Sequence, residues 1–298
     1  MKIRVGFGLG TRSRTHDADR FVDMVEALEE HRFDSIWFSD RISGEAPDPV
    51  VAMSVAAART TRIKFGMSVM VLPGRNPAVV AKQLASLDRL SNGRLLPAFG
   101  LGARDAVEHQ AFGVKREQRA ALFDEALPLI RRLWTGERID HDGAAFHLEG
   151  VRVLPRPVQD PLEVWLGGVA PSELRRVARL GDGWLPSFCT PEEVGAGISA
   201  INDEAARHDR AIDQEHFGAL IAYSLGEVPD RLAALVQRRR PELDPSDVIP
   251  TGLDGLADQI RAFVEVGASK FVVLPVVEPD EWRPALDELA SAVLPLQN

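Results

Sequence analysis

Residues 65–77, FGMSVMVLPGRNP, decide the fold prediction because they join two kinds of structure in one short stretch. Residues 63–71 form an almost continuous apolar run, which is typical of a parallel strand buried on both faces. The run ends in a loop with Arg75 and Asn76. Asn76 followed by Pro77 is a typical helix start, with asparagine as the N-cap and proline at the first helical position. The stretch therefore predicts a buried strand followed by a helix over 76–91.

The same unit repeats along the chain. The first four predicted strands begin near residues 3, 35, 63 and 95. A repeat of about 30 residues suits parallel strands that are joined by helical crossovers. The pattern resumes later with predicted strands at 162–168, 183–188, 216–226 and 270–277.

Eight strands that alternate with eight helices predict an α/β fold, the (β/α)8 TIM barrel, as a single domain over residues 1–298. Two stretches interrupt the rhythm, at about 103–162 and 227–252, and are predicted to be insertions after strands 4 and 7. The first contains a long helix and a β-hairpin. An open doubly wound sheet is the alternative, but GFGLGTRS (6–13) lacks the Gly-x-Gly-x-x-Gly pattern.

Composition disfavours several classes of protein. The net charge is −9, with acidic and basic residues interleaved, so no nucleic acid partner is expected. The single cysteine, Cys189, rules out an internal disulfide framework and a cysteine-rich zinc site. The start of the chain lacks the features of a signal peptide, and no apolar stretch approaches about 18 residues. We therefore expect a cytoplasmic protein with no membrane partner.

In a barrel, functional side chains lie at the C-terminal ends of the strands. The predicted ends carry no histidine, so no metal site is expected, and no Gly-x-Ser-x-Gly nucleophile elbow is present. Asp40 and Asp105 supply two carboxylates, but aromatic residues for sugar stacking are sparse, which disfavours a glycosidase. The residues at these ends include Gly8, Gly10, Ser39, Asp40, Arg41, Met67, Ser68, Gly102, Arg104, Asp105, Gly167, Gly168, Ser187, Phe188, Tyr223, Ser224 and Pro275.

Such a mouth of glycines, small residues and apolar walls suits a flat organic cofactor that carries its own reactivity. Gly167 and Gly168 precede a helix predicted from about Pro171. Backbone N–H groups at a glycine turn and a helix N-terminus can together hold a phosphate. The alternative is that these glycines only form a tight strand-to-helix turn.

The tract from Gly66 to Gly102 resembles the signature of the luciferase-like monooxygenase superfamily, and most closely its branch that uses coenzyme F420. The shared pattern is P-x-R-N-P-x-x-x-A-K-Q-x-A-x-L-D-x-L-S-x-G-R, which begins at Pro73. The resemblance covers about residues 3–295. Supporting pieces are SIWFSDR (35–41), AFGV (111–114), FDEALPLIRRLW (123–134) and RLGDGWLPS (179–187).

The resemblance implies a bulge in the third strand behind the cofactor's ring, often with a non-prolyl cis peptide. Here that peptide would be Met67–Ser68 or Ser68–Val69. The resemblance also implies that Asp40 touches the deazaflavin ring or its hydroxyl, and that Asp105 lies near the substrate. Arg75 and Asn76 are expected only to fix the loop and to cap the third helix.

Relatives with sugar-phosphate or alcohol substrates carry a histidine after the aspartate of the second strand, whereas this chain has Arg41. Histidine-based alcohol oxidation is therefore not expected. Three roles stay open for the arginine: it anchors an anionic substrate, it pairs with Asp40, or it is a solvated surface charge.

The resulting hypothesis is an F420-dependent oxidoreductase that transfers a hydride between the deazaflavin C5 and a small organic substrate. Asp40 and Asp105 are the predicted catalytic residues, one of which moves the accompanying proton. The expected partners are the substrate, a second copy in a homodimer and an F420 or flavin reductase. The predicted cofactor-binding residues are Phe7, Ser39, Asp40, Met67, Ser68, Val69, Gly102, Gly167, Gly168 and Ser187, and the predicted substrate-binding residues are Arg41 and Arg104.

Two alternatives stay open. The first is an FMN-dependent monooxygenase of the same superfamily, which uses O2 and a separate reductase. The second is a barrel that binds a flavin-like ligand, or none, and catalyses nothing. The two insertions are expected to shape the substrate pocket, and neither carries a motif that names the substrate.

Overall fold

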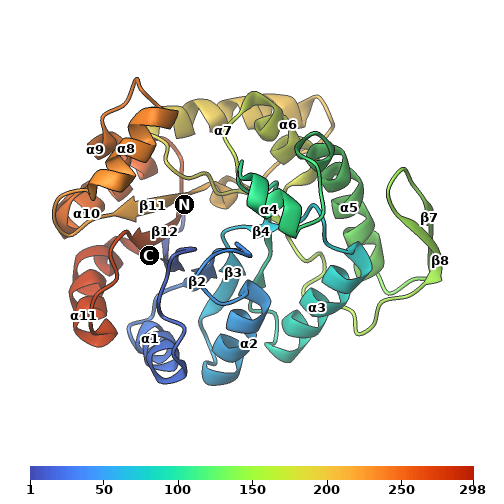
Figure 1. Cartoon of the computed structure of the whole chain (residues 1–298), viewed down its shortest axis with the longest axis horizontal. Helices are drawn as coiled ribbons and strands as arrows, with labels where there is room; N and C mark the ends of the chain where they lie inside the picture. Colours follow the sequence, from blue (N-terminus) through green and yellow to red (C-terminus); the bar gives the residue numbers. More distant parts are fainter.

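The structure is a computed structural model that describes residues 1–298 except for the side chain of Arg239. Helices surround a set of central strands (Figure 1). The strands are β1 (Arg4–Leu9), β2 (Ser35–Phe38), β3 (Lys64–Met67), β4 (Met70–Val71), β5 (Leu95–Leu96), β6 (Ala98–Gly100), β7 (Ile139–Asp142), β8 (His147–Val151), β9 (Trp165–Leu166), β10 (Gly183–Trp184), β11 (Gly218–Tyr223) and β12 (Lys270–Pro275).

The helices follow the strands in sequence, and most of them lie on the outside of the molecule in Figure 1. Among the described residues, no helix has both the length and the apolar character needed to cross a bilayer. The helices are α1 (Ala18–Glu30), α2 (Pro49–Arg59), α3 (Pro77–Leu90), α4 (Ala106–Ala111), α5 (Arg119–Trp134), α6 (Pro171–Leu180), α7 (Pro191–Ala206), α8 (Asp230–Arg239), α9 (Pro245–Val248), α10 (Gly252–Glu265) and α11 (Trp282–Val293).

The central strands form two sheets in which every pairing is parallel. One sheet has the order β11-β12-β1-β2-β3-β5 and the other β10-β9-β6-β4. The predicted third and fourth strands each cross from the first sheet to the second, as β3 then β4 and as β5 then β6. Isolated parallel bridges, Trp184 with Phe217 and Ser187 with Leu220, join the other edges. The prediction of an α/β fold with parallel strands is therefore confirmed.

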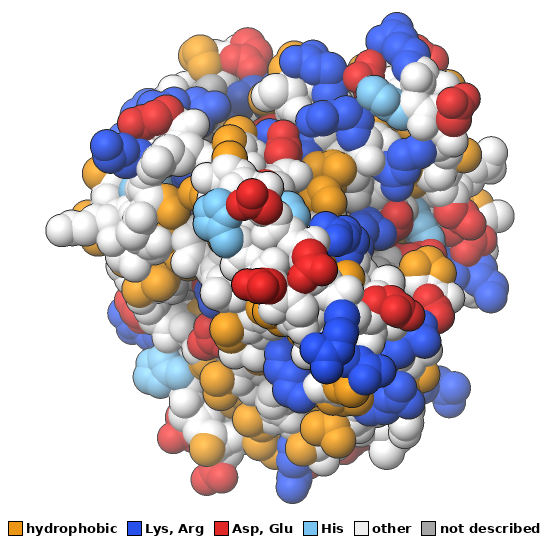
Figure 2. Space-filling model, turned by 90° about the vertical axis from the view of Figure 1, so that its right-hand side faces the viewer, with side chains coloured by type: hydrophobic (Ala, Val, Ile, Leu, Met, Phe, Trp, Pro, Cys, Tyr) orange, Lys and Arg blue, Asp and Glu red, His pale blue; other side chains and the backbone are white. Residues whose placement is uncertain are grey.

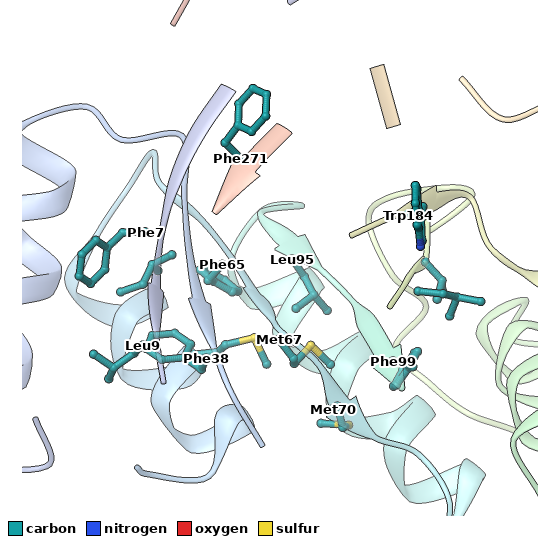
Figure 3. Close-up of a cluster of buried hydrophobic side chains, with 14 of the residues drawn as sticks. Phe7, Leu9, Phe38, Phe65, Met67, Met70, Leu95, Phe99, Trp184 and Phe271 are labelled. Carbon is teal, nitrogen blue, oxygen red and sulfur yellow. The ribbon is translucent and has the colours of Figure 1, made fainter. Parts of the chain in front are cut away.

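The strands are apolar on both faces because each face packs against a different layer. The larger core lies between the sheet and the helices, and Figure 3 shows part of it, with side chains from β1, β2, β3 and β6. A smaller cluster fills the opposite, inner face and includes Trp37, Trp165 and Val272. Gly66 makes room for this cluster, because a Cβ there would lie 2.8 Å from the Trp37 ring.

Local capping sets several helix starts as predicted. The Asp48 and Asn76 side chains each accept N–H groups from the first turn of α2 and α3. The long helix expected in the first insertion is a short 3-10 turn, Arg116–Gln118, followed by α5. The β-hairpin within the first insertion is confirmed as β7 and β8, which pair antiparallel.

The hairpin side of the molecule is the face seen in Figure 2. Acidic and basic side chains both occur across that face, and a group of Lys and Arg side chains lies beside acidic ones.

Three helices inside the insertions were not predicted: α4, α8 and α9. The helices α8 and α9 share a small core of their own, in which Val236 of α8 packs with Val248 and Ile249. This core is separate from the two clusters around the strands. The stretch at 227–252 is therefore a packed helical unit beside the strand ends.

Candidate active site

A cavity of about 1290 Å³ opens at the C-terminal ends of the strands. Residues that follow β1, β2, β6, β9 and β12 line it, and α8 forms one wall. The volume exceeds the roughly 300–1,000 Å³ of ordinary small-molecule pockets, so it has room for a cofactor and a substrate together. The predicted site residues that line it are Ser39, Asp40, Arg41, Ser68, Val69, Gly102, Gly167, Gly168 and Ser187.

Two predicted cofactor residues, Phe7 and Met67, lie on the other face of the sheet. Phe7 is fully buried and packs edge-on against Phe33 and Trp282, with ring centroids 6.5 and 5.5 Å away. Met67 belongs to the same outer core (Figure 3). The expectation that they line the cavity is wrong, because side chains alternate along a strand and these positions point toward the helices.

The two other predicted residues outside the lining follow β6. Arg104 is exposed. Asp105 is the N-cap of α4: its carboxylate accepts the N–H of Val107 at 2.9 Å and is ion-paired with Arg41. Neither residue lines the cavity, so Asp105 contributes to it only by positioning the guanidinium of Arg41.

Asp40 is a buried carboxylate of the cavity, with 4% of its side chain exposed. Its Oδ2 accepts the N–H of Val71 at 2.9 Å and an N–H of Arg75 at 2.8 Å, while the Arg75 Nε donates to the Val71 carbonyl at 2.9 Å. Burial raises the pKa of Asp40 above its usual value, and it outweighs the opposing effects of Arg75 and the Val71 N–H. Arg75 therefore does more than fix the loop, and Arg41 does not pair with Asp40.

A second polar cluster ties α4 to the loop after β2. Glu108 accepts the backbone N–H groups of Ile42 at 3.1 Å and Ser43 at 2.9 Å, as well as the Ser43 hydroxyl. The Nε of Arg41 lies 3.7 Å from the same carboxylate. Burial alone would raise the pKa of Glu108, but these hydrogen bonds and Arg41 together lower it. Glu108 is therefore an ionised structural group at the cavity wall.

His109 is a cavity residue that the sequence prediction missed. It follows Glu108 on α4, and its Nε2 donates to the Ala103 carbonyl at 3.0 Å. With Nε2 engaged as a donor, Nδ1 is the ring nitrogen without a hydrogen-bond partner among the described residues. One feature of the sequence could have revealed it. Asp105 is a typical N-cap residue, and a short helix that starts after it places Glu108 and His109 one turn beyond the strand end.

The N–H groups of the glycine turn before α6 already donate to a side chain of the protein. Gly168 has φ +98°, and a Cβ there would lie 2.6 Å from the Glu173 carboxyl carbon. The Oε2 of Glu173 accepts the N–H groups of Val169 and Ala170, both at 2.9 Å. Two of the donors expected for a phosphate are thus held by an internal carboxylate.

Two buried arginines of the cavity hold loops in place. Arg119 donates from one nitrogen to the carbonyls of Leu101, Gly102 and Ala103, at 3.1, 3.0 and 2.9 Å. Arg176 donates to Asp124 at 2.5 Å. Arg119 thereby fixes the turn after β6, where Gly102 lines the cavity with φ +81°.

The break in the third strand lies at Ser68–Val69, which is a cis peptide and the second of the two positions that the resemblance implies. Ser68 and Val69 both line the cavity. Within the described part of the chain, the buried Ser68 Oγ has no hydrogen-bond partner. A buried hydroxyl without a partner at a cavity wall is a ready contact for a polar ligand atom.

The chain belongs to the luciferase-like monooxygenase family, whose model matches residues 2–268. It is similar to an F420-dependent glucose-6-phosphate dehydrogenase of Gordonia bronchialis, at 30% identity over 94% of this chain and 87% of the relative. A protein of the same name from Amycolatopsis mediterranei is 32% identical over 84% of this chain and 87% of its own.

Solved structures share the fold at lower identity. An F420-dependent secondary alcohol dehydrogenase, in complex with an F420–acetone adduct, superposes with a TM-score of 0.82 at 18% identity over 100% of both chains. The monooxygenase RslO1 of Streptomyces bottropensis superposes with a TM-score of 0.80 at 23% identity over 99% of both chains. The prediction of the superfamily is confirmed.

Proposed function

We propose that the protein is an F420-dependent oxidoreductase that acts on a small organic substrate. The observation that carries this proposal is the cavity at the strand ends with the orphaned Ser68 Oγ at its wall, in a chain similar to named F420-dependent dehydrogenases. When bound, the deazaflavin supplies hydride transfer at its C5. Everything else the reaction requires must come from the residues of the cavity.

The residues present fit a flat ring. Val69 and the glycines after β6 and β9 give one part of the lining an apolar surface without bulky side chains. A Cβ on Gly167 would lie 3.4 Å from Val69, so Gly167 keeps the surface beside Val69 open. We assign Ser39, Ser68, Val69, Gly102, Gly167, Gly168 and Ser187 to binding of the cofactor.

Asp40 is the residue we assign to proton movement. Both of its hydrogen bonds, from Val71 and Arg75, end on Oδ2, which leaves Oδ1 facing no partner among the described residues. Burial raises the pKa of Asp40 and makes it easier to protonate than an exposed aspartate, which suits a group that takes and returns a proton. Arg75 keeps the carboxylate in one orientation.

Arg41 and His109 face the part of the cavity beside Asp40's strand and α4. The Arg41 guanidinium is fixed by Asp105 and Glu108, which balance its charge, so it offers a substrate N–H donors in a fixed position. We assign Arg41 to substrate binding and His109 Nδ1 to a polar contact with the substrate. Arg104 and Asp105 receive no direct role.

The proposal also covers closure of the barrel, the positions of the insertions and the oligomeric state. The two parallel bridges support closure of the strands into a (β/α)8 barrel with insertions after the fourth and seventh strands. Exposed Val51 and Val55 on α2 and Val79 on α3 support a homodimer through these early helices. Light scattering of the purified protein tests the dimer, and replacing Val55 and Val79 by Asp would give monomers.

A turnover experiment tests the proposed function against its alternative. Oxidised F420 is mixed with the protein and a panel of hydride donors that includes glucose 6-phosphate and secondary alcohols, and reduced F420 with a panel of carbonyl compounds. Reduced FMN is mixed with the protein and both panels, in air and without oxygen. The proposal predicts substrate-dependent change in the deazaflavin absorbance without oxygen uptake. Rapid oxygen uptake with reduced FMN would instead identify an FMN-dependent monooxygenase, and binding without turnover would identify a binding protein.

A further inference from the structure

We infer that the cavity face of α8, together with the loop after β1, is a binding site for an anionic group, a phosphate or a carboxylate. The inference rests on the proposed function for the identity of the ligand, but the charge arrangement is independent of it. Arg231 and Arg238 of α8 and Arg12 of the loop after β1 all line the cavity.

These three arginines differ from the other arginines of the lining. Arg41, Arg119 and Arg176 each have acidic or carbonyl partners, as described above. Arg14, also in the lining, lies 3.3 Å from Glu45. Among the described residues, no ion pair involves Arg12, Arg231 or Arg238.

Glu278 and Glu173 also line the cavity and keep their negative charges, but neither forms an ion pair with these three arginines. Glu278 lines the same side, but its carboxylate accepts the hydroxyls of Ser13 and Thr15 and the N–H of Arg14. Glu173 caps the turn before α6. Arginines without a paired carboxylate leave this part of a concave surface with an excess of positive charge, which attracts anions.

The position of α8 is built to present this charge. Arg231, Leu235 and Arg238 lie four and three residues apart, so they share one face of the helix, and all three line the cavity. Val236 points away, into the small core with Val248 and Ile249. The helix therefore carries a fixed face on which two guanidinium groups flank an apolar side chain.

The other obvious anion site of the cavity is already used. The N–H groups before α6 are held by Glu173, so an acidic part of a ligand meets a carboxylate there and free guanidinium groups at α8. Two sources can supply the anion: the phosphate tail of the deazaflavin cofactor, or an acidic group on the substrate.

The test compares the double variant Arg231→Gln/Arg238→Gln with Arg175→Gln, an exposed arginine of α6 outside the cavity lining. Tryptophan fluorescence gives the affinity for F420 and for the same chromophore without its phosphate tail, at low and high salt. Thermal shift with inorganic phosphate is measured in parallel. Each lost charge-assisted contact weakens binding by about tenfold.

If the cluster binds the cofactor tail, the double variant loses affinity for F420 by about tenfold or more, keeps its affinity for the chromophore alone, and shows weaker salt dependence. If it binds an acidic substrate group, F420 affinity is unchanged and stabilisation by phosphate is lost. The inference is overturned if the double variant matches Arg175→Gln in both measurements. A wild-type protein that binds neither deazaflavin would contradict the proposed function, while the phosphate arm would still decide the inference.

Discussion

The two ends of the strands handle buried charge in opposite ways. At the N-terminal end, Lys270 opens β12 and its Nζ lies 2.7 Å from Asp34, just before β2. The ammonium also lies 5.8 and 6.0 Å from the ring centroids of Trp37 and Trp165. Only 3% of Lys270 is exposed, so its charge is enclosed and balanced. Burial lowers the pKa of Lys270, and Asp34 opposes that shift.

At the C-terminal end, charges border the cavity and are balanced only in part. Asp40 uses one oxygen for Arg75 and Val71 and leaves the other facing no partner, while Arg231 and Arg238 have no acidic partner among the described residues. The same set of parallel strands thus encloses balanced charge at one end and opens to a cavity, the proposed ligand site, at the other, as in α/β barrels.

The largest expected effect is the loss of stability when the buried ion pair at the N-terminal end of the strands is broken. Lys270→Met leaves Asp34 buried without its cation, so the free energy of unfolding falls by about 3–5 kcal/mol in a urea titration. The double variant Asp34→Asn/Lys270→Met removes both charges and should recover a large part of that loss. If the single variant is as stable as the wild type, the Lys270–Asp34 ion pair does not stabilise the N-terminal end of the strands.

The next largest effect is on the reaction rate and concerns Asp40 at the C-terminal end of the strands. Asp40→Asn keeps an acceptor for the Val71 N–H but cannot take up a proton, so hydride transfer slows by about a hundredfold. Single-turnover kinetics with oxidised F420 and a hydride donor, or with reduced F420 and a carbonyl compound, measure the rate. Cofactor affinity should change by less than about threefold, since the carbonyl of asparagine preserves the loop. Equal rates in the two proteins would remove Asp40 from the chemistry.

A smaller effect distinguishes anion binding at the glycine turn before α6 from anion binding at α8. Glu173→Ala removes the internal carboxylate from the N–H groups of Val169 and Ala170, which costs about 1 kcal/mol of stability through the lost helix cap. The freed N–H groups then donate to an anion, so F420 binds a few times more tightly, while the chromophore without its phosphate tail binds unchanged. Weaker F420 binding would mean that Glu173 supports the ligand instead of competing with it.

The smallest effect concerns pH. The folded-state pKa of Glu108 lies below its usual 4.5, so its contribution to stability is present above pH 4.5 and is lost as the pH falls through the folded-state value. Glu108→Gln should therefore flatten the decline of the unfolding free energy in acid and lower it slightly at pH 7. Chemical denaturation at several pH values measures this, and an unchanged acid slope would contradict it.

The alternation of strands and helices was predictable because each strand is a continuous apolar run and several helices start with a visible cap. The same continuity hid which residues face the cavity. In β1, RVGFGL, both faces are buried, so the sequence pattern cannot tell the inner from the outer side, and Phe7 was assigned to the wrong one.

The polar part of the site was harder to predict because its partners are distant in sequence. Arg41 meets Asp105 across 64 residues, and Asp40 meets Arg75 across 35. No spacing rule joins such pairs. The helix α8 was not predicted because its apolar residues pack on a small core that they share with distant residues of α9, away from the strands.

The most direct test of the central claim is a titration of the ligand-free protein with F420 and, separately, with FMN, followed by tryptophan fluorescence. Trp184 is suited to report binding, since its Nε1 donates at 2.8 Å to the carbonyl of Gly168 at the cavity wall. The account predicts F420 binding with a dissociation constant of about 1 μM or lower, which is about 8 kcal/mol, and much weaker binding of FMN. Preference for FMN, or failure to bind either ligand, would contradict it.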